Sequence, residues 1–170
     1  MSQSPEITLA DVHETLLGPL LVLAMSDAAA DEVTPPLGSV PGWNSERLNW
    51  FRAYHRAASS GLRGPAGEKS WVVLCDGSPA GSVRLKLTAD NRTAETGIWL
   101  AHSFRRCGIG TAAMALVLAA ARRAGLRAVT AQTTAGNSAA QRLLRAAGAV
   151  LTHDGDGGVS AVVVLSADFQ

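Results

Sequence analysis

Two spacings of hydrophobic residues alternate along this chain, and the change between them separates predicted strands from predicted helices. Between residues 81 and 88, apolar side chains alternate with Arg84 and Lys86, a period of two that predicts a strand with one polar face. Between residues 48 and 58, large or apolar side chains recur every three or four residues, which predicts a helix with one buried stripe. These patterns predict strands over residues 6–12, 70–75, 81–88, 95–101, 128–133, 149–152 and 159–165, and helices over 19–30, 45–59, 111–124 and 137–147.

Glycine, proline and small polar residues mark the connections between these elements. Loops are expected over residues 34–43 and 61–69, a tight turn over 76–79, and a hairpin turn over 154–158. Strands that alternate with helices and end in a hairpin predict an α+β fold with a mixed sheet. The length of 170 residues fits one domain, over residues 1–170.

A glycine-rich turn, from Arg105 to Ala112, is the most informative segment of the sequence. It joins the apolar strand of residues 95–101 to a long alanine-rich helix. Backbone N–H groups at a helix N-terminus lack helical partners and favour negative charge. Gly108 and Gly110 allow a ligand to approach that backbone closely. The turn therefore predicts a pyrophosphate site.

The same turn also fits G-x-G-x-x-A, which is typical of dinucleotide-binding folds. Those folds place an acidic residue about twenty positions further on, but Ala128 stands there and no acid occurs between Glu95 and Asp154. They also place the turn after the first strand, whereas several strands precede it here. A nicotinamide or flavin site and a purely structural turn stay open as alternatives.

The spacing of Arg105, Gly108 and Gly110 resembles the Q/R-x-x-G-x-G/A loop of the GNAT superfamily of acetyl-CoA-dependent N-acetyltransferases. Asn137, which begins a second helix, and Gly148, which ends it, resemble that family's N-x-x-A-x-x-x-Y-x-x-x-G-F segment. The resemblance extends over residues 70–165. It implies a mostly antiparallel sheet flanked by helices and splayed at the acetyl-CoA site, with residues 70–170 binding the cofactor and 1–69 the acceptor.

The resemblance also implies roles for individual residues. The backbone at the end of the central strand is expected to bind the pantetheine arm and the acetyl carbonyl, and the loop and Asn137 the rest of the cofactor. Glu95, the only carboxylate on that strand, is the expected general base, and His102 is a second candidate. The cofactor-binding residues implied are Trp99, Leu100, Ala101, Arg105, Arg106, Cys107, Gly108, Ile109, Gly110, Thr111 and Asn137.

Two positions depart from the family pattern. Leu144 stands where the family commonly has the Tyr that protonates the departing thiolate, and Ala149 replaces a Phe. The general acid is therefore unassigned. Because a thiol of pKa about 8.5 is a fairly good leaving group, solvent or the Ser138 hydroxyl is expected to suffice.

Charge and aromatic residues point to the acceptor. Residues 1–95 hold eight Lys/Arg and eleven Asp/Glu, whereas residues 96–153 hold seven Arg and no acid. The basic part fits a polyanionic coenzyme, and the acidic part suggests a cationic acceptor. Half of the chain's eight aromatic residues fall between residues 43 and 54. The expected acceptor-binding residues are Asp31, Glu32, Trp43, Trp50 and Tyr54, although packing alone would explain the aromatic ones.

These observations lead to an N-acetyltransferase that acts on a primary amine of a small cationic acceptor, with aminoglycoside-type antibiotics first and polyamines next. Acetylation of a protein N-terminus or lysine, and a non-catalytic coenzyme A-binding sensor, stay open. Four scattered His and two separated Cys predict no metal site. We expect no nucleic-acid or membrane partner and a cytoplasmic location, and a homodimer is compatible with the sequence.

Overall fold

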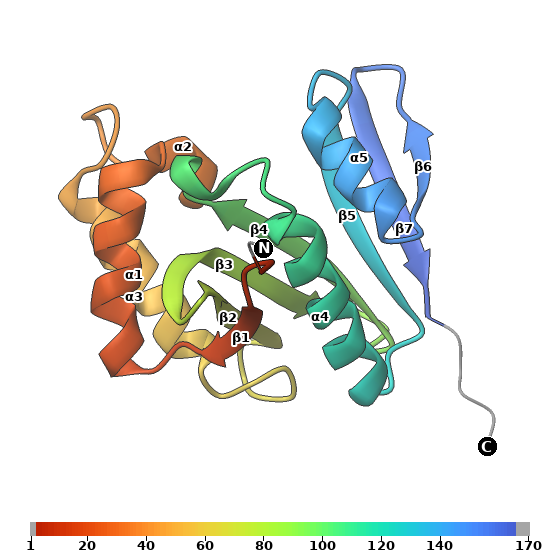
Figure 1. Ribbon diagram of the computed structural model, residues 1–170, viewed down its shortest axis with the longest axis horizontal. Helices are drawn as coiled ribbons and strands as arrows, with labels where there is room; N and C mark the ends of the chain where they lie inside the picture. The colour runs from red at the N-terminus through yellow and green to blue at the C-terminus, as the bar shows by residue number, and fades with distance from the viewer. Residues whose placement is uncertain (1–2, 166–170) are drawn as a thin grey trace.

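The computed structural model describes residues 3–165 and contains one seven-stranded sheet with helices on both faces (Figure 1). The strands are β1 (Ile7–Asp11), β2 (Glu68–Cys75), β3 (Ser78–Leu87), β4 (Thr93–Leu100), β5 (Ala128–Thr134), β6 (Val150–His153) and β7 (Gly158–Val164). The helices are α1 (Glu14–Asp27), α2 (Ala30–Val33), α3 (Ser45–Ala58), the 3-10 turn η1 (His102–Phe104), α4 (Ile109–Arg123) and α5 (Ser138–Ala146).

The strand order is β1-β2-β3-β4-β5-β7-β6, and every neighbouring pair is antiparallel except β4 and β5. The predicted fold class, a mixed and mostly antiparallel sheet flanked by helices, is confirmed. Helices α1 and α3 lie on one face of the sheet, and α4 and α5 on the other (Figure 1).

The period of two in β3 explains this layering. Val83 and Leu85 are buried against Met114 and Val117 of α4. Arg84 and Lys86 alternate with them and therefore project from the opposite face, toward α3, where they line a cavity. The predicted polar face of this strand thus forms part of a hollow between the sheet and the helices.

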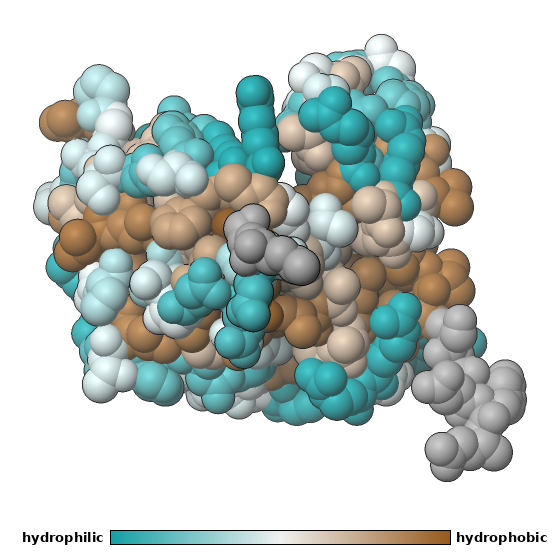
Figure 2. All heavy atoms as spheres, in the orientation of Figure 1, coloured by the Kyte–Doolittle hydropathy of each residue, from teal (hydrophilic) through white to brown (hydrophobic). Residues whose placement is uncertain are grey.

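Strands β4 and β5 lie side by side only at their beginnings. Their pairing covers Thr93–Glu95 and Ala128–Thr130, after which β4 continues to Leu100 and β5 to Thr134 without pairing. We call this divergence the β4–β5 wedge. Figure 2 shows a notch in the surface between the part formed by α5, β6 and β7 and the rest of the molecule. The predicted splay of the sheet is therefore present.

The structure corrects several predicted boundaries. Helix α1 begins at Glu14 instead of residue 19, because the carbonyl of His13 accepts the N–H groups of Leu16 and Leu17 and Pro19 is accommodated inside the helix. It ends at Asp27, and α2 forms a separate turn. Strand β2 begins at Glu68, because residues predicted as loop extend its ladder with β3. No helix of residues 3–165 is both long and apolar enough to cross a membrane.

Candidate active site

The loop between β4 and α4 forms an anion-binding cradle. Arg106 and Gly108 adopt left-handed backbone conformations, with φ of 63° and 76°, and α4 begins directly after Gly108. Among the described residues, none accepts a hydrogen bond from the backbone N–H groups of residues 106–111. These N–H groups at the N-terminus of a 15-residue helix suit a pyrophosphate.

The two glycines of this loop serve different purposes. Gly108 has open space around it, and its positive φ is a conformation that a side chain disfavours. A Cβ at Gly110, by contrast, would lie 2.7 Å from the Leu143 side chain of α5. Gly110 is buried, and its missing side chain allows α4 and α5 to pack closely, whereas its backbone N–H remains part of the cradle.

The first arginine of the loop contacts protein groups. Arg105 Nη2 lies 2.5 Å from Glu32 Oε2, and its Nε donates to the carbonyl oxygen of Leu100 at 3.1 Å. His102 Nε2 lies 3.2 Å from the same Glu32 oxygen. The backbone N–H of Ser103 donates to Asp27 at 3.0 Å. The end of α1 and the turn α2 are thus bound to the cofactor loop.

The predicted residues beyond the wedge lie at the beginning of α5. Asn137 caps that helix, since its Oδ1 accepts from the Ala140 N–H at 3.0 Å, and Ser138 is exposed beside it. Leu144 is buried against Ala131 and Ala161. Position 144 is therefore an apolar packing position in this chain, and it offers no proton donor.

A cavity of about 560 Å³ lies on the other side of β4, between the sheet and helices α2 and α3. Glu95 and Trp99 of β4 line it, and the backbone of the same strand forms one side of the wedge. A molecule in the cavity and one in the wedge would therefore meet across β4. The lining residues are Glu32, Val33, Thr34, Pro35, Trp50, Phe51, Tyr54, His55, Glu68, Ser82, Val83, Arg84, Lys86, Glu95, Gly97, Ile98 and Trp99.

A chain of polar side chains crosses the floor of this cavity. The Tyr54 hydroxyl donates a short hydrogen bond to Glu68, whose carboxylate lies 3.8 Å from Arg84 Nη1. Arg84 Nη2 lies 2.9 Å from Glu95 Oε1. A Cβ at Gly97 would lie 3.0 Å from Arg84 Nε, so the missing side chain allows the guanidinium to lie across β4. The expected base is thus positioned by Arg84.

Burial changes the ionisation of two residues in the cavity wall. Desolvation, and then the hydrogen bond with Glu68, raise the pKa of Tyr54 well above its ordinary value of 10.0. Desolvation lowers the pKa of His55 from 6.5 to about 4, so this imidazole is neutral at pH 7. The other acidic and basic residues that line the cavity are Glu32, Glu68, Glu95, Arg84 and Lys86.

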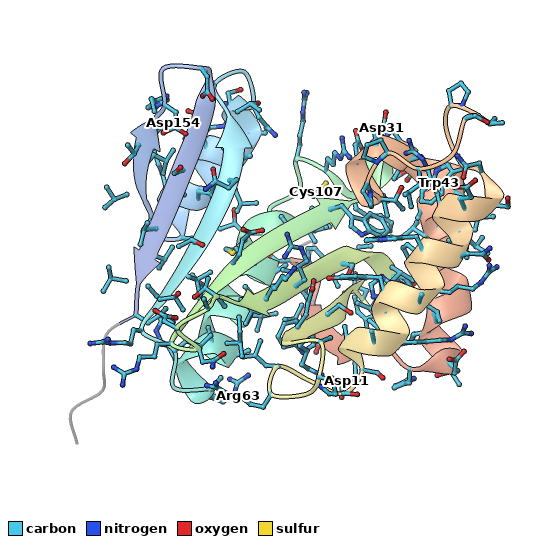
Figure 3. The ribbon with its side chains drawn as sticks, turned by 180° about the vertical axis from the view of Figure 1, so that it is seen from behind. Asp11, Asp31, Trp43, Arg63, Cys107 and Asp154 are labelled. Atoms are coloured by element: carbon cyan, nitrogen blue, oxygen red, sulfur yellow. The ribbon has the colours of Figure 1, made fainter. Side chains whose placement is uncertain are left out.

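The structure separates the five residues predicted around the acceptor. Glu32, Trp50 and Tyr54 line the cavity, and the rings of the last two are stacked, 4.9 Å apart. Asp31 lies outside it, with an exposed carboxylate 2.7 Å from Arg47 Nη2. Trp43 also lies outside it, where its Nε1 donates to the carbonyl of Ala28 (Figure 3). The structure therefore brings three of the five predicted residues to the cavity, and Asp31 and Trp43 are not among its lining residues.

Sequence reasoning missed Glu68 and Arg84 as cavity residues. The sequence pattern predicts a loop at Glu68 and a solvent-facing strand position at Arg84. The period of two carried a usable signal, because Ser70 and Glu68 share a face of β2 that is buried against α3. No group of three potential metal ligands occurs within residues 3–165.

An anion cradle at a helix N-terminus, a splayed sheet and an adjoining carboxylate-lined cavity are the features expected of a coenzyme A-dependent acyltransferase. The sequence profile of the Acetyltransferase (GNAT) family matches residues 33–149. The chain therefore belongs to the GNAT family, whose acetyl donor is acetyl-CoA, and it is an N-acetyltransferase. The loop geometry described above fits that donor.

Solved structures of acetyltransferases share this fold. RimL, the ribosomal L7/L12 alpha-N-protein acetyltransferase in complex with coenzyme A, has a TM-score of 0.75 at 20% identity over 95% of this chain and 96% of its own. The GNAT domain of S. lividans PAT has a TM-score of 0.70 at 15% identity, covering 95% and 90%.

The microcin C7 self-immunity acetyltransferase MccE, in complex with acetyl-CoA and AMP, has a TM-score of 0.70 at 15% identity, covering 94% and 93%. A search of curated proteins gives no match. At these identities, the likeness concerns the fold.

Proposed function

We propose that this N-acetyltransferase acts on a primary amine of a small cationic acceptor, with aminoglycoside-type antibiotics as the first class and polyamines as the second. The observation that carries the proposal is the cavity beside the wedge, whose lining includes two stacked aromatic rings and three carboxylates. Carboxylates and aromatic faces both attract ammonium groups. Its volume of about 560 Å³ suits a small molecule or a short chain segment.

The reaction requires a neutral amine. Glu95 lies where β4 and β5 separate, so its carboxylate can take a proton from an ammonium bound in the cavity, directly or through water. The amine nitrogen then attacks the thioester carbon and the C–N bond forms. The C–S bond breaks as the thiolate leaves with its electron pair, and the nitrogen gives up its second proton to the thiolate or to water, which leaves the amide and free coenzyme A. The backbone at Trp99–Ala101 is proposed to orient the acetyl group and to stabilise the oxyanion. His102 contacts Glu32 at the loop, which makes it the weaker candidate for a base.

The test is a panel of aminoglycosides, polyamines, amino acids and peptides incubated with acetyl-CoA, with release of free thiol as the measurement. Glu95→Gln is expected to lower kcat about 10²- to 10⁴-fold with the amine that reacts. Glu46→Gln, which removes an exposed carboxylate outside the cavity, is the matched control and should retain activity. Unchanged turnover in Glu95→Gln across the pH range would remove Glu95 as the base.

A peptide N-terminus is the second candidate acceptor. Arg84 and Lys86 bring positive charge into the cavity, which suits an acceptor that carries a carbonyl or carboxylate near its amine better than a polycation. The structural likeness to RimL, an alpha-N-protein acetyltransferase, agrees with this interpretation. Acetylation of peptides without acetylation of aminoglycosides or polyamines would replace the first proposal by the second. We propose a cytoplasmic location, where acetyl-CoA is available, for either acceptor.

A further inference from the structure

Glu32 belongs to two sites at once. It lines the acceptor cavity together with its neighbours Val33 and Thr34. Its Oε2 atom also lies 2.5 Å from Arg105 Nη2 and 3.2 Å from His102 Nε2, both of which precede the anion cradle. Among the described residues, this carboxylate is the one that contacts the cofactor loop and also lines the cavity.

Arg105 is held away from the cradle by the same contact. Its Nη2 is bound to Glu32 and its Nε to the carbonyl of Leu100, so its guanidinium lies toward the acceptor side. A pyrophosphate bound to the free N–H groups of residues 106–111 would be a stronger partner, because arginine binds phosphate oxygens in a bidentate manner. Phosphate and Glu32 therefore compete for one guanidinium.

We propose that Arg105 and Glu32 form an exchangeable ion pair that couples the two sites. The pyrophosphate of acetyl-CoA takes Arg105, and the released Glu32 carboxylate then becomes available to the ammonium of the acceptor. Glu32 is thereby a specificity-determining residue. Its carboxylate is paired with Arg105 before the cofactor binds, and it can bind the acceptor's ammonium group afterwards. The second half of this inference rests on the proposed cationic acceptor, whereas the first half concerns the cofactor alone.

The surroundings allow such an exchange. The side chains of Arg105 and Glu32 are 40% and 38% exposed. Water can therefore solvate both charged groups when the ion pair opens. Asp27 binds the backbone N–H of Ser103 independently, which keeps α1 attached to the loop while the pair opens. Burial raises the pKa of Glu32, but the hydrogen bonds from Arg105 and His102 outweigh it and lower the pKa overall, so the group is ionised at pH 7.

The consequence for the cofactor is measurable without any acceptor. In the native protein, coenzyme A must displace Arg105 from Glu32, whereas in Glu32→Gln the guanidinium is free from the start. Partly exposed ion pairs contribute about 0.2–1 kcal/mol, so Glu32→Gln is expected to bind coenzyme A about 1.5- to 5-fold more tightly. Because coupling between two sites is reciprocal, the acceptor should gain affinity from the cofactor by the same factor.

Titration calorimetry with coenzyme A tests the pair directly. Glu46→Gln is the matched control, since it removes one exposed carboxylate from α3 without a recorded ion pair in the described part of the chain, and it should leave the dissociation constant unchanged. Arg105→Gln should weaken binding. In the double variant Arg105→Gln/Glu32→Gln, the tightening caused by Glu32→Gln should disappear, because it acts through Arg105.

Each outcome decides one point. Unchanged or weaker coenzyme A binding by Glu32→Gln would overturn the exchange. If Glu32→Gln still tightened binding in the absence of Arg105, the cause would be the loss of a negative charge near the cofactor, and the exchange would also be overturned. Tightening that requires Arg105 supports it. Failure of the amine panel would contradict the proposed function but leave this binding result intact. If the native protein acetylates an amine but Glu32→Gln leaves the dissociation constant for coenzyme A unchanged, the exchange is contradicted and the proposed function is not.

Discussion

Acidification should destabilise this protein through His55, the buried imidazole in the cavity wall. His55 is 2% exposed, and its Nδ1 lies 2.8 Å from Ser70 Oγ. Desolvation lowers its pKa in the folded chain to about 4, whereas in the unfolded chain it titrates near 6.5. Between these two values the unfolded state binds the additional proton, so the free energy of unfolding falls as the pH falls from 6.5 to 4.

The magnitude follows from the two pKa values. Each pKa unit corresponds to about 1.36 kcal/mol, so the full difference between 6.5 and about 4 is worth about 3 kcal/mol. About 2 kcal/mol of this is already lost between pH 7 and pH 5. Domains of this kind have a total stability of about 5–15 kcal/mol, so the effect is a large fraction of the total.

Urea unfolding at pH 7, 6 and 5 measures this loss. His55→Asn places an amide that does not titrate near Ser70, so its stability should be lower at every pH but should fall about 2 kcal/mol less between pH 7 and pH 5. His153→Asn removes an exposed imidazole and is the matched control. The carboxylates are common to all three proteins and cancel in the comparison. Parallel pH profiles for the native protein and His55→Asn would refute the reasoning.

Two further changes probe the cavity floor. Tyr54→Phe removes the donor to Glu68, and urea unfolding should show a loss of about 1.5–3 kcal/mol, the range for hydrogen bonds to charged groups. Because the pKa of Tyr54 is raised in the folded state, the native protein should also lose stability as the pH rises above 10, and Tyr54→Phe should lose less. Gly97→Ala places a Cβ 3.0 Å from Arg84 Nε, and the displaced guanidinium should lower kcat about ten- to a hundredfold through Glu95, with a circular dichroism spectrum unchanged. A kcat within twofold of the native value would show that Arg84 does not position Glu95.

The cofactor side of the site could be predicted because its signal is local. Arg105 to Ala112 lie next to one another, and the positive φ of Gly108 is a conformation that glycine favours. Helix α4 is predicted from residue 111 and begins at Ile109, two residues earlier. The period of two in β3 likewise identified its two faces. The loop before α4 and the two faces of β3 depend on residues that are close together in the sequence, so the order of residues alone indicates them.

The acceptor side depends on register, which a single sequence does not display. Glu68, Lys86 and Glu95 come from three strands and lie opposite one another only because β2, β3 and β4 pair as they do. Asp31 and Glu32 are adjacent and chemically alike, yet one pairs with Arg47 and the other contacts Arg105. Which of the two faces the cavity is determined by how the single turn α2 packs.

Leu144 stands where the family commonly has a tyrosine, and this raises the question of which costs more free energy at pH 7, release of an unprotonated thiolate or deprotonation of the amine. Leu144 packs against Ala131 and Ala161, so no donor reaches the sulfur from this position. A thiolate leaving at pH 7 is disfavoured by about 1.5 pKa units relative to the thiol, or about 2 kcal/mol. An alkyl ammonium of pKa about 10.4 must lose its proton at a cost of more than 4 kcal/mol at the same pH. Deprotonation of the amine therefore costs more free energy than release of the thiolate, and the proposed base, Glu95, is the cavity residue that would act on it.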